Sequence, residues 1–383
     1  MPEVEATIAD RLVDHIRNRT TDMADHDLWI PTRHFVDKGR ADAEVALMRR
    51  LPLIVAHHSE LPEPGSFITR SLLGTPLIIV RQSDGTVAAF HNICKHRGGR
   101  VEPEAAGSKR VFMCAYHGWT YERDGGGLRS VPFRDCYEEV DVATSGLTTV
   151  RAEERHGLVW ITLQPGDDAA TVADYLGPEV EEKLRGYQLD QTVVFLDEKF
   201  DLEMNWKLVM DGAIDMLHPM FLHPNGVGKL IPTNISAWIE YGRHGQNFAP
   251  RKRAERNATS GEPVEATFRF FASNLVVYPN SMVIAAPDHV EYWLVWPDIN
   301  NPAKSRVEIR FLVLPERLTD EGAGRLRRSW EVLRQAAVEE DWPMTASIQR
   351  NAIASPEGSY HYGRSEVTCQ HLHLRLAEDL GGF

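Results

Sequence analysis

The chain has 383 residues, 43% hydrophobic and 25% charged, which is typical of a globular protein large enough for two domains. Its formal net charge of -13 argues against a nucleic-acid partner, because phosphate backbones repel an acidic surface. No apolar run approaches the roughly 20 residues that cross a bilayer, the N-terminus lacks the apolar segment of a secretory signal, and four cysteines are too few for a disulfide scaffold. We therefore expect a cytoplasmic protein without a membrane partner.

Residues 1–49 are polar, and 41–50 are rich in helix-forming residues, so we expect an N-terminal helical segment that packs with the larger C-terminal domain. Residues 27–31 are expected to be a loop or turn. From about residue 50 the pattern changes to short β-rich runs separated by turn residues. It predicts a small all-β domain over residues 50–165, with strands at 51–57, 66–72, 76–81, 87–91, 111–113, 119–121, 128–131 and 158–163.

Residues 166–383 have a mixed pattern and are predicted to form the larger domain, with the boundary near Pro165-Gly166. The polar segment 243–261 is expected to be a mobile loop. Residues 322–340 have apolar positions at helical spacing and are predicted to form one long helix. A helix is also expected at 176–187, and strands at 192–202, 268–277, 282–286, 290–296 and 305–314. Together these elements indicate an α+β fold of the helix-grip type, an antiparallel sheet with a long C-terminal helix.

Two cysteines and two histidines in the β-rich part form the first candidate metal site. Cys94 and His96 are one residue apart, and after seventeen further residues Cys114 and His117 follow, two residues apart. Two thiolates and two imidazoles suit either a structural zinc ion or a [2Fe–2S] cluster of the Rieske type, in which cysteines bind one iron and histidines the other. Each pair contains one Cys and one His, which favours the two-iron cluster because each loop then reaches both irons.

A second candidate metal site lies around Asp215, His218 and His223. Two histidines and a carboxylate with open positions are typical of a non-haem Fe(II) oxygenase. On a regular helix the two histidines would point about 140° apart, but Pro219 and Pro224 disfavour helical geometry at the residue before each of them. A broken helix could therefore bring both rings to one metal. The alternative is that the two histidines only cap the end of a helix.

The segments 90–98 (FHNICKHRG) and 114–121 (CAYHGWTY) resemble the Rieske domain of ring-hydroxylating oxygenase alpha subunits, and the resemblance extends over roughly residues 50–165. The segment from Asp215 to His223 resembles the mononuclear-iron motif of the same family. The resemblance implies that a Rieske [2Fe–2S] cluster is bound by Cys94, His96, Cys114 and His117. It also implies a mononuclear Fe(II) bound by His218, His223 and Asp341.

Asp341 is the choice for the third iron ligand by its position in the motif, with Glu339 and Glu340 as competitors. In this resemblance Asp215 is a catalytic bridge that hydrogen-bonds an iron-binding histidine and a Rieske histidine, expected to be His117, of a neighbouring subunit. Asp211 and Leu217 depart from the residues that many ring dioxygenases carry at these places. The departures concern the substrate and the dioxygenase assignment more than the iron site.

The resemblance implies a terminal oxygenase component that hydroxylates a small aromatic or related apolar compound with O2, as in aromatic hydrocarbon catabolism. Electrons would come from a ferredoxin or a flavin reductase, so that NAD(P)H acts only indirectly through a separate reductase. The expected assembly is a homotrimer, or an alpha3beta3 complex with a small beta subunit. The alternatives are a Rieske monooxygenase that performs N- or O-dealkylation, a Rieske electron carrier without a catalytic iron, and a zinc-stabilised binding module.

Candidate pocket residues are apolar ones near the histidine motif and on the predicted strands: Val209, Met210, Ala213, Phe221, Leu222 and Leu275. The basic run at residues 251–253 either attracts a carboxylated substrate or is a solvated loop. Lys95, Arg97, Arg100 and Arg110 could steer an acidic electron donor to the Rieske cluster. Cys136 and Cys369 are expected to be buried thiols without a role.

Overall fold

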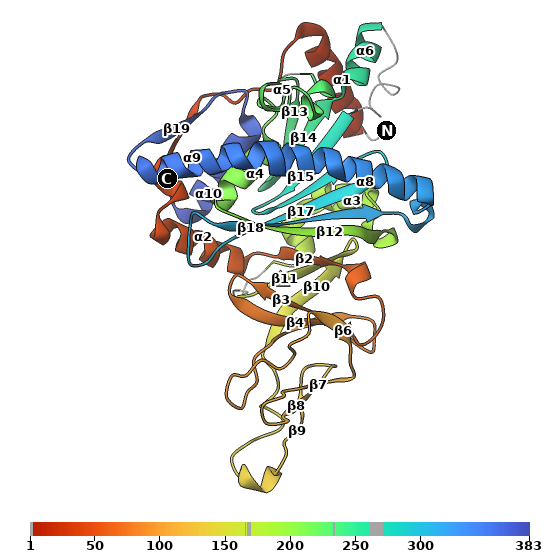
Figure 1. The fold of residues 1–383 in the computed structure, drawn as a ribbon, viewed down its shortest axis with the longest axis vertical. Helices are drawn as coiled ribbons and strands as arrows, with labels where there is room; N and C mark the ends of the chain where they lie inside the picture. Colours follow the sequence, from red (N-terminus) through yellow and green to blue (C-terminus); the bar gives the residue numbers. More distant parts are fainter. Residues whose placement is uncertain (1–2, 165, 167–169, 233, 261–270) are drawn as a thin grey trace. The chain divides into compact units, whose positions relative to one another are not determined.

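The computed structural model describes residues 3–164, 166, 170–232, 234–260 and 271–383 (Figure 1). The chain divides into two compact units. The α+β unit comprises Met1–Leu47, Leu176–Lys183 and Phe195–Phe383, and the β unit comprises Met48–Tyr175 and Leu184–Val194. The division into domains at 1–49, 50–165 and 166–383 stays a prediction. Among the described residues, no helix combines the length and the apolar character that crossing a membrane requires.

The β unit is built from two antiparallel sheets, as the short β-rich runs of its sequence predict. The larger has the strand order β2-β11-β10-β5-β4-β3-β6 and the smaller the order β7-β8-β9. Their strands are β2 (Leu53–His57), β3 (Ser66–Leu72), β4 (Thr75–Arg81), β5 (Val87–His91), β6 (Ala106–Ser108), β7 (Val111–Met113), β8 (Thr120–Glu122), β9 (Leu128–Ser130), β10 (Thr149–Arg155) and β11 (Leu158–Thr162). The sequence did not predict β6 and β10, since β6 is exposed and β10 is largely charged. A core that includes Phe67, Phe90, Phe112 and Trp119 is buried in this unit.

The α+β unit contains a sheet with the strand order β12-β18-β17-β16-β15-β14-β13. Neighbours from β13 to β18 pair antiparallel. The strands are β12 (Val193–Leu202), β13 (Ala237–Tyr241), β14 (His244–Pro250), β15 (Phe271–Val277), β16 (Ser281–Ala285), β17 (Val290–Pro297) and β18 (Ser305–Val313). β18 is almost wholly buried and β17 is buried in its middle, as expected for inner strands of a sheet.

A long helical stretch runs across the sheet (Figure 1). It consists of α8 (Asp320–Arg334), a π-helical segment, η7 (Gln335–Asp341), and α9 (Trp342–Ala354). The helix-grip prediction is confirmed, but the predicted single helix at 322–340 differs in its second half. Pro343 has no N–H to donate and crowds the carbonyl four residues earlier, which disfavours regular α-helical geometry at this place.

The remaining helices are α1 (Glu3–Asn18), α2 (Lys38–Arg50), α3 (Val172–Gly186), α4 (Trp206–Ile214), α5 (Pro219–Leu222), α6 (Lys252–Ser260) and α10 (Val367–Leu380). In the α+β unit β1 (Leu28–Pro31) pairs antiparallel with β19 (Ser359–Tyr362). The prediction of a loop or turn at 27–31 is therefore wrong, because the partner strand lies more than 300 residues away in sequence.

The predicted mobile loop at 243–261 is also wrong over its described residues, 243–260. β14 is buried along its whole length between β13 and β15, and α6 follows it. This strand contains buried polar residues such as Gln246 and Asn247, so its sequence lacks the apolar pattern from which a strand is predicted. Gly261, and residues 268–270 of the predicted strand at 268–277, lie outside the described residues.

A buried ion pair holds the N-terminal end of α4, the helix that leads to the histidine motif. The Nζ atom of Lys207 lies 2.7 Å from each carboxylate oxygen of Glu44, and Trp206 donates its Nε1–H to the same carboxylate. Burial lowers the pKa of Lys207, and the charge of Glu44 opposes that shift. The Asn205 side chain caps the helix by accepting a hydrogen bond from the backbone of Lys207.

Candidate metal centres

His218, His223 and Asp341 come together in the α+β unit. The Nε2 atoms of the two histidines are 3.3 Å apart, and Asp341 Oδ1 lies 2.9 Å from His223 Nε2 and 3.4 Å from His218 Nε2. One ligand atom from each residue lies within 4.8 Å of the other two. Two imidazole nitrogens and one carboxylate oxygen that face a common point suit an Fe(II) ion with open coordination positions.

The backbone breaks at the histidine motif as the prolines predict. α4 ends at Ile214, and the short helix α5 starts at Pro219 and ends at Leu222, so that His218 and His223 flank it. Gly228 packs against this turn so closely that a Cβ atom there would overlap the carbonyl oxygens of Pro219 and His223. The broken helix brings together two rings that a regular helix would hold apart.

Each histidine of this triad is oriented by a carboxylate on its other ring nitrogen. His218 Nδ1 lies 2.8 Å from Asp215 Oδ2, and His223 Nδ1 contacts Glu340 Oε2. A carboxylate at Nδ1 fixes that nitrogen as the donor and leaves Nε2 free to bind a metal. Asp215 also accepts a hydrogen bond from the backbone N–H of Leu217 at 2.7 Å, which holds the carboxylate in place.

The three acids at residues 339–341 occupy three different environments. Asp341 faces both histidines, Glu340 contacts the outer nitrogen of His223, and Glu339 forms an exposed ion pair with Arg334 at 2.7 Å. This arrangement supports the choice of Asp341 over its two neighbours as the metal-binding carboxylate.

The charges in the triad shift its pKa values in opposite directions. Although burial works the other way, hydrogen bonds to Asp215 and Asp341 raise the pKa of His218 to about 9. Burial likewise opposes the shift of Asp341, but His218 and His223 hold the pKa of its carboxyl below the ordinary value. Without a metal, protons on the imidazoles thus balance the charge of the Asp341 carboxylate, and a cation bound at the triad would replace them.

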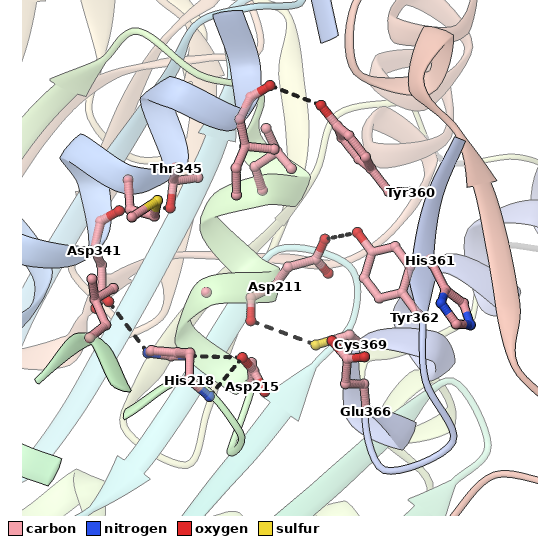
Figure 2. Close-up of a pocket in the computed structure, with 15 residues that line it drawn as sticks. Asp211, Asp215, His218, Asp341, Thr345, Tyr360, His361, Tyr362, Glu366 and Cys369 are labelled. Carbon is pink, nitrogen blue, oxygen red and sulfur yellow. Dashed lines mark hydrogen bonds and ion pairs between the residues drawn. The ribbon is translucent and has the colours of Figure 1, made fainter. Parts of the chain in front are cut away.

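A cavity of about 310 Å³ opens beside the triad, and we call it the triad cavity (Figure 2). Its wall includes Asp215, His218 and Asp341 together with Met344 and Glu366. Of the pocket residues predicted from sequence, Leu222 lines this cavity, whereas Val209, Met210 and Leu275 are buried core residues and Phe221 is exposed. Closeness in sequence to the histidine motif could not predict which residues line the cavity, because much of its wall comes from the distant elements α9, β19 and α10.

A hydrogen-bonded group that sequence reasoning missed lies on the same wall. Asp211 accepts a hydrogen bond from the Tyr362 hydroxyl at 2.7 Å (Figure 2), and its carboxylate also lies 3.0 Å from His373 Nε2. Cys369 is buried against the same helix, as predicted. Residues 362 and 373 are 150 positions or more from Asp211, and no short motif connects them.

The second candidate centre lies in the β unit, where two loops of the same design hold the predicted Rieske residues. Cys94 follows β5 and Cys114 follows β7. In each loop the glycine four residues after the cysteine, Gly98 or Gly118, has a positive φ and donates its N–H to the cysteine carbonyl at 2.9 Å. A left-handed residue is needed to close so tight a turn, which explains the glycine in both loops.

The side chains in these loops fit an iron–sulfur cluster. Cys94 and Cys114 are buried and form no disulfide, and His96 Nδ1 is buried without a hydrogen-bond partner among the described residues. The His96 ring stacks on Trp119 with the ring centroids 5.0 Å apart. A metal group bound by both thiols and by this imidazole nitrogen would give each of these buried atoms a partner.

Tyr121 links one cysteine to the backbone of its loop. Its hydroxyl lies 3.2 Å from Cys94 Sγ and accepts a hydrogen bond from the Lys95 N–H at 2.9 Å. Burial and the neighbouring Cys94 raise the pKa of Tyr121, so the hydroxyl stays protonated and can donate to the sulfur. Burial and Arg97 lower the pKa of His117, which therefore favours the neutral imidazole that binds metals.

Three large apolar side chains of the β unit are exposed, and one of them, Tyr116, contacts His117 with the ring centroids 3.8 Å apart. Met113 is 59% exposed, Tyr116 66% and Phe133 85%. We call these three residues the Rieske patch. Arg97 lies over the Tyr116 ring, 4.9 Å from its centroid. Cys136 is exposed, so the prediction that it is a buried thiol is wrong; it belongs to a short 3-10 turn next to Phe133.

Comparisons with known proteins identify the families of the two parts of the chain that contain these candidate centres. Residues 52–146 match the family model of the Rieske [2Fe-2S] domain, and residues 189–382 match that of the ring hydroxylating alpha subunit (catalytic domain). The second match extends over about half of the chain. The chain therefore belongs to the family of ring-hydroxylating alpha subunits with a Rieske domain, and the [2Fe–2S] cluster is favoured over the structural zinc ion.

Two curated relatives illustrate the range of the family. The chain is 34% identical over 184 residues to the glycine betaine monooxygenase oxygenase subunit of Chromohalobacter salexigens, which covers 47% of this chain and 39% of the relative. It is 26% identical over 367 residues to the carnitine monooxygenase oxygenase subunit of Escherichia coli K12, covering 91% of this chain and 93% of the relative. The first four relatives are matched over only 39% to 54% of their length, so the chain spans about half of them.

The fold also agrees with a solved structure of the family. The quaternary ammonium Rieske monooxygenase CntA in complex with L-carnitine superposes with a TM-score of 0.76 at 21% identity, covering 96% of this chain and 97% of that one. This likeness confirms the α+β catalytic fold and the Rieske domain.

Proposed function

We propose that this protein is the terminal oxygenase of a multicomponent system, which inserts oxygen from O2 into a small organic substrate. The observation that carries the proposal is the triad of His218, His223 and Asp341, whose ligand atoms lie within 4.8 Å of one another beside a cavity. A Rieske electron carrier would have no use for such a site.

When bound, a Rieske cluster would supply single electrons, and an Fe(II) ion at the triad would supply O2 activation. The chain's own residues prepare both sites. Asp215 and Glu340 orient the two histidines, Asp341 supplies the third ligand, and Tyr121 donates a hydrogen bond to Cys94. Open coordination positions at the triad leave room for O2.

Asp215 is proposed to connect the two redox centres between subunits. Its carboxylate lines the triad cavity while it hydrogen-bonds His218. The Rieske patch exposes three large apolar side chains, one of them in contact with the His117 ring, and such side chains suit a contact with another chain. We propose that the patch of one copy docks at the triad cavity of the next, so that His117 meets Asp215 of the neighbouring chain. A ring-shaped homotrimer closes such contacts, with or without a small beta subunit.

The electron donor is proposed to be a ferredoxin or a flavin reductase. Lys95, Arg97, Arg100 and Arg110 are exposed or partly exposed basic residues of the β unit, in a chain of net charge -13. Such local positive charge would attract an acidic donor and increase the association rate at low salt.

The reaction is proposed to be hydroxylation, and the relatives favour single oxygen insertion as its form. The glycine betaine and carnitine enzymes are monooxygenases by name. Hydroxylation of a carbon next to nitrogen leads to loss of that N-alkyl group, so N-dealkylation is the second candidate. Hydroxylation of an aromatic ring stays the first prediction from sequence.

The metal content tests the proposal. We expect three irons and two acid-labile sulfides per chain after anaerobic purification, with a Rieske signal by electron paramagnetic resonance after reduction with dithionite. Two irons with no third would leave only an electron carrier, and zinc without visible absorption would exclude both. Asp215→Asn serves as a functional variant: it should retain all three irons and lose most turnover, whereas loss of iron would assign Asp215 a ligand role instead.

A further inference from the structure

A second cavity of the α+β unit, of about 790 Å³, lies between the sheet and α8, and we call it the sheet cavity. Apolar side chains line much of it, among them Leu230, Val332 and Leu333. Its volume falls within the range of pockets that enclose a small organic molecule. None of its described lining residues also lines the triad cavity.

Two wall residues of the sheet cavity lie close in sequence to proposed iron ligands. Val227, on its wall, is four residues after His223, and the turn between them is closed by a hydrogen bond of 3.1 Å from the Gly226 N–H to the His223 carbonyl. Ala336, on the opposite segment, is five residues before Asp341. The segments that carry two of the three proposed ligands therefore continue directly into the wall of this cavity.

The acidic side chains of the sheet cavity already have a cationic partner. His289 is buried, with Nδ1 2.8 Å from Asp288 and Nε2 3.3 Å from Glu291. Trp293 also lies 3.3 Å from the Glu291 carboxylate through its Nε1–H. Although burial works the other way, both acids raise the pKa of His289, which favours the protonated ring. The single charge of His289 thus offsets part of the negative charge of these two carboxylates within the cavity wall.

Two arginines of the same cavity have no acidic partner among the residues that the structure describes. No described residue forms an ion pair or a side-chain hydrogen bond with the guanidinium of Arg251 or of Arg328, whereas Arg325 pairs with Glu321 at 2.6 Å. A guanidinium beside an apolar wall is a binding group for a carboxylate, because its planar fork matches the two oxygens.

We propose that the sheet cavity is the substrate site of this oxygenase and selects an organic carboxylate, an apolar body whose anionic end is held by Arg251 and Arg328. The inference rests on the proposed function and names the substrate class of the same iron site. It places specificity in two arginines that lie outside the histidine motif. Quaternary ammonium compounds without a carboxylate lack the anionic group that these arginines recognise and are expected to bind more weakly.

Equilibrium binding to the iron-loaded enzyme under anaerobic conditions tests the inference without turnover. The probes are benzoate, 2-naphthoate and decanoate, the three matching primary amides, and (2-naphthylmethyl)trimethylammonium, each titrated by calorimetry. We expect at least one carboxylate to bind 10-fold or more tightly than its amide. Arg251→Gln and Arg328→Gln should each weaken the carboxylate by about 10-fold or more and leave the amide unchanged, as loss of a charge-assisted hydrogen bond predicts.

Arg325→Gln is the matched control, because Arg325 lies on the same helix and lines the same cavity but is already paired. Equal weakening by Arg325→Gln and Arg328→Gln would overturn the inference, since a general field effect would then explain both. So would tighter binding of the ammonium probe, or no preference for any carboxylate over its amide. Iron content is measured on the same samples: loss of the third iron refutes the proposed function, whereas full iron without anion preference refutes this inference alone.

Discussion

Three consecutive acids at residues 339–341 allow the iron-ligand assignment to be tested by substitution. Asp341 Oδ1 lies 2.9 Å from His223 Nε2 and 3.4 Å from His218 Nε2, so Asp341→Ala removes one of the three atoms that face the metal position. We expect Asp341→Ala to contain two irons per chain and an unchanged Rieske signal, because two histidines without the carboxylate cannot retain the ion through purification.

Glu340→Gln should weaken the binding of Fe(II) without abolishing it. The carboxylate contacts His223 Nδ1 and orients the ring without facing the metal position. Loss of such an orienting partner weakens metal affinity by about 10- to 100-fold, which corresponds to about 1.4 to 2.8 kcal/mol. Glu339→Gln is the control, since Glu339 is half exposed and pairs only with Arg334 among the described residues.

The assay is iron and acid-labile sulfide per chain, followed by Fe(II) affinity from competition with a chelator under anaerobic conditions. We expect complete loss of the third iron in Asp341→Ala, weaker Fe(II) binding in Glu340→Gln and no change in Glu339→Gln. If Glu340→Gln loses the third iron completely while Asp341→Ala retains it, the roles of the two acids are exchanged and the assignment is refuted.

Three further substitutions probe the supporting structure. Gly228→Ala should reduce iron retention without affecting the Rieske signal, because the new methyl group overlaps the turn that holds the iron histidines; full retention would contradict this packing. Glu44→Gln should destabilise the α+β unit by about 3 to 5 kcal/mol in chemical denaturation, because it leaves the Lys207 charge buried without its partner; a change below 1 kcal/mol would contradict it. Tyr121→Phe should lower the Rieske midpoint potential by roughly 40 mV, since about 1 kcal/mol of stabilisation of the reduced cluster is lost with the hydrogen bond to Cys94; an unchanged potential would contradict it.

The β unit was predictable from sequence because its signals are local. Strands such as 66–72 and 87–91 are short runs that contain β-forming or apolar residues and lie between turn residues, and the structure has them at the same bounds. The Cys94 and Cys114 loops are equally local, since each carries its own glycine and closes on itself.

The α+β unit was less predictable because its decisive contacts are remote in sequence. β1 depends on a partner strand at the other end of the chain, and β14 is buried although its residues are polar. The partners of Asp211 are also remote in sequence, since β19 supplies Tyr362 and α10 supplies His373. Neither periodicity nor spacing contains the information that these segments meet.

The iron triad is a further case, because regular helices would have separated its ligands. An ideal helix would place His218 and His223 about 140° apart and would point Glu340 and Asp341 about 100° apart. Pro219 begins a new helix between the histidines, and the π-helical segment before Pro343 ends at Asp341. The irregular backbone thus lets His223 receive Asp341 at Nε2 and Glu340 at Nδ1. Helical periodicity therefore cannot identify these ligands, whereas the prolines that disrupt it can.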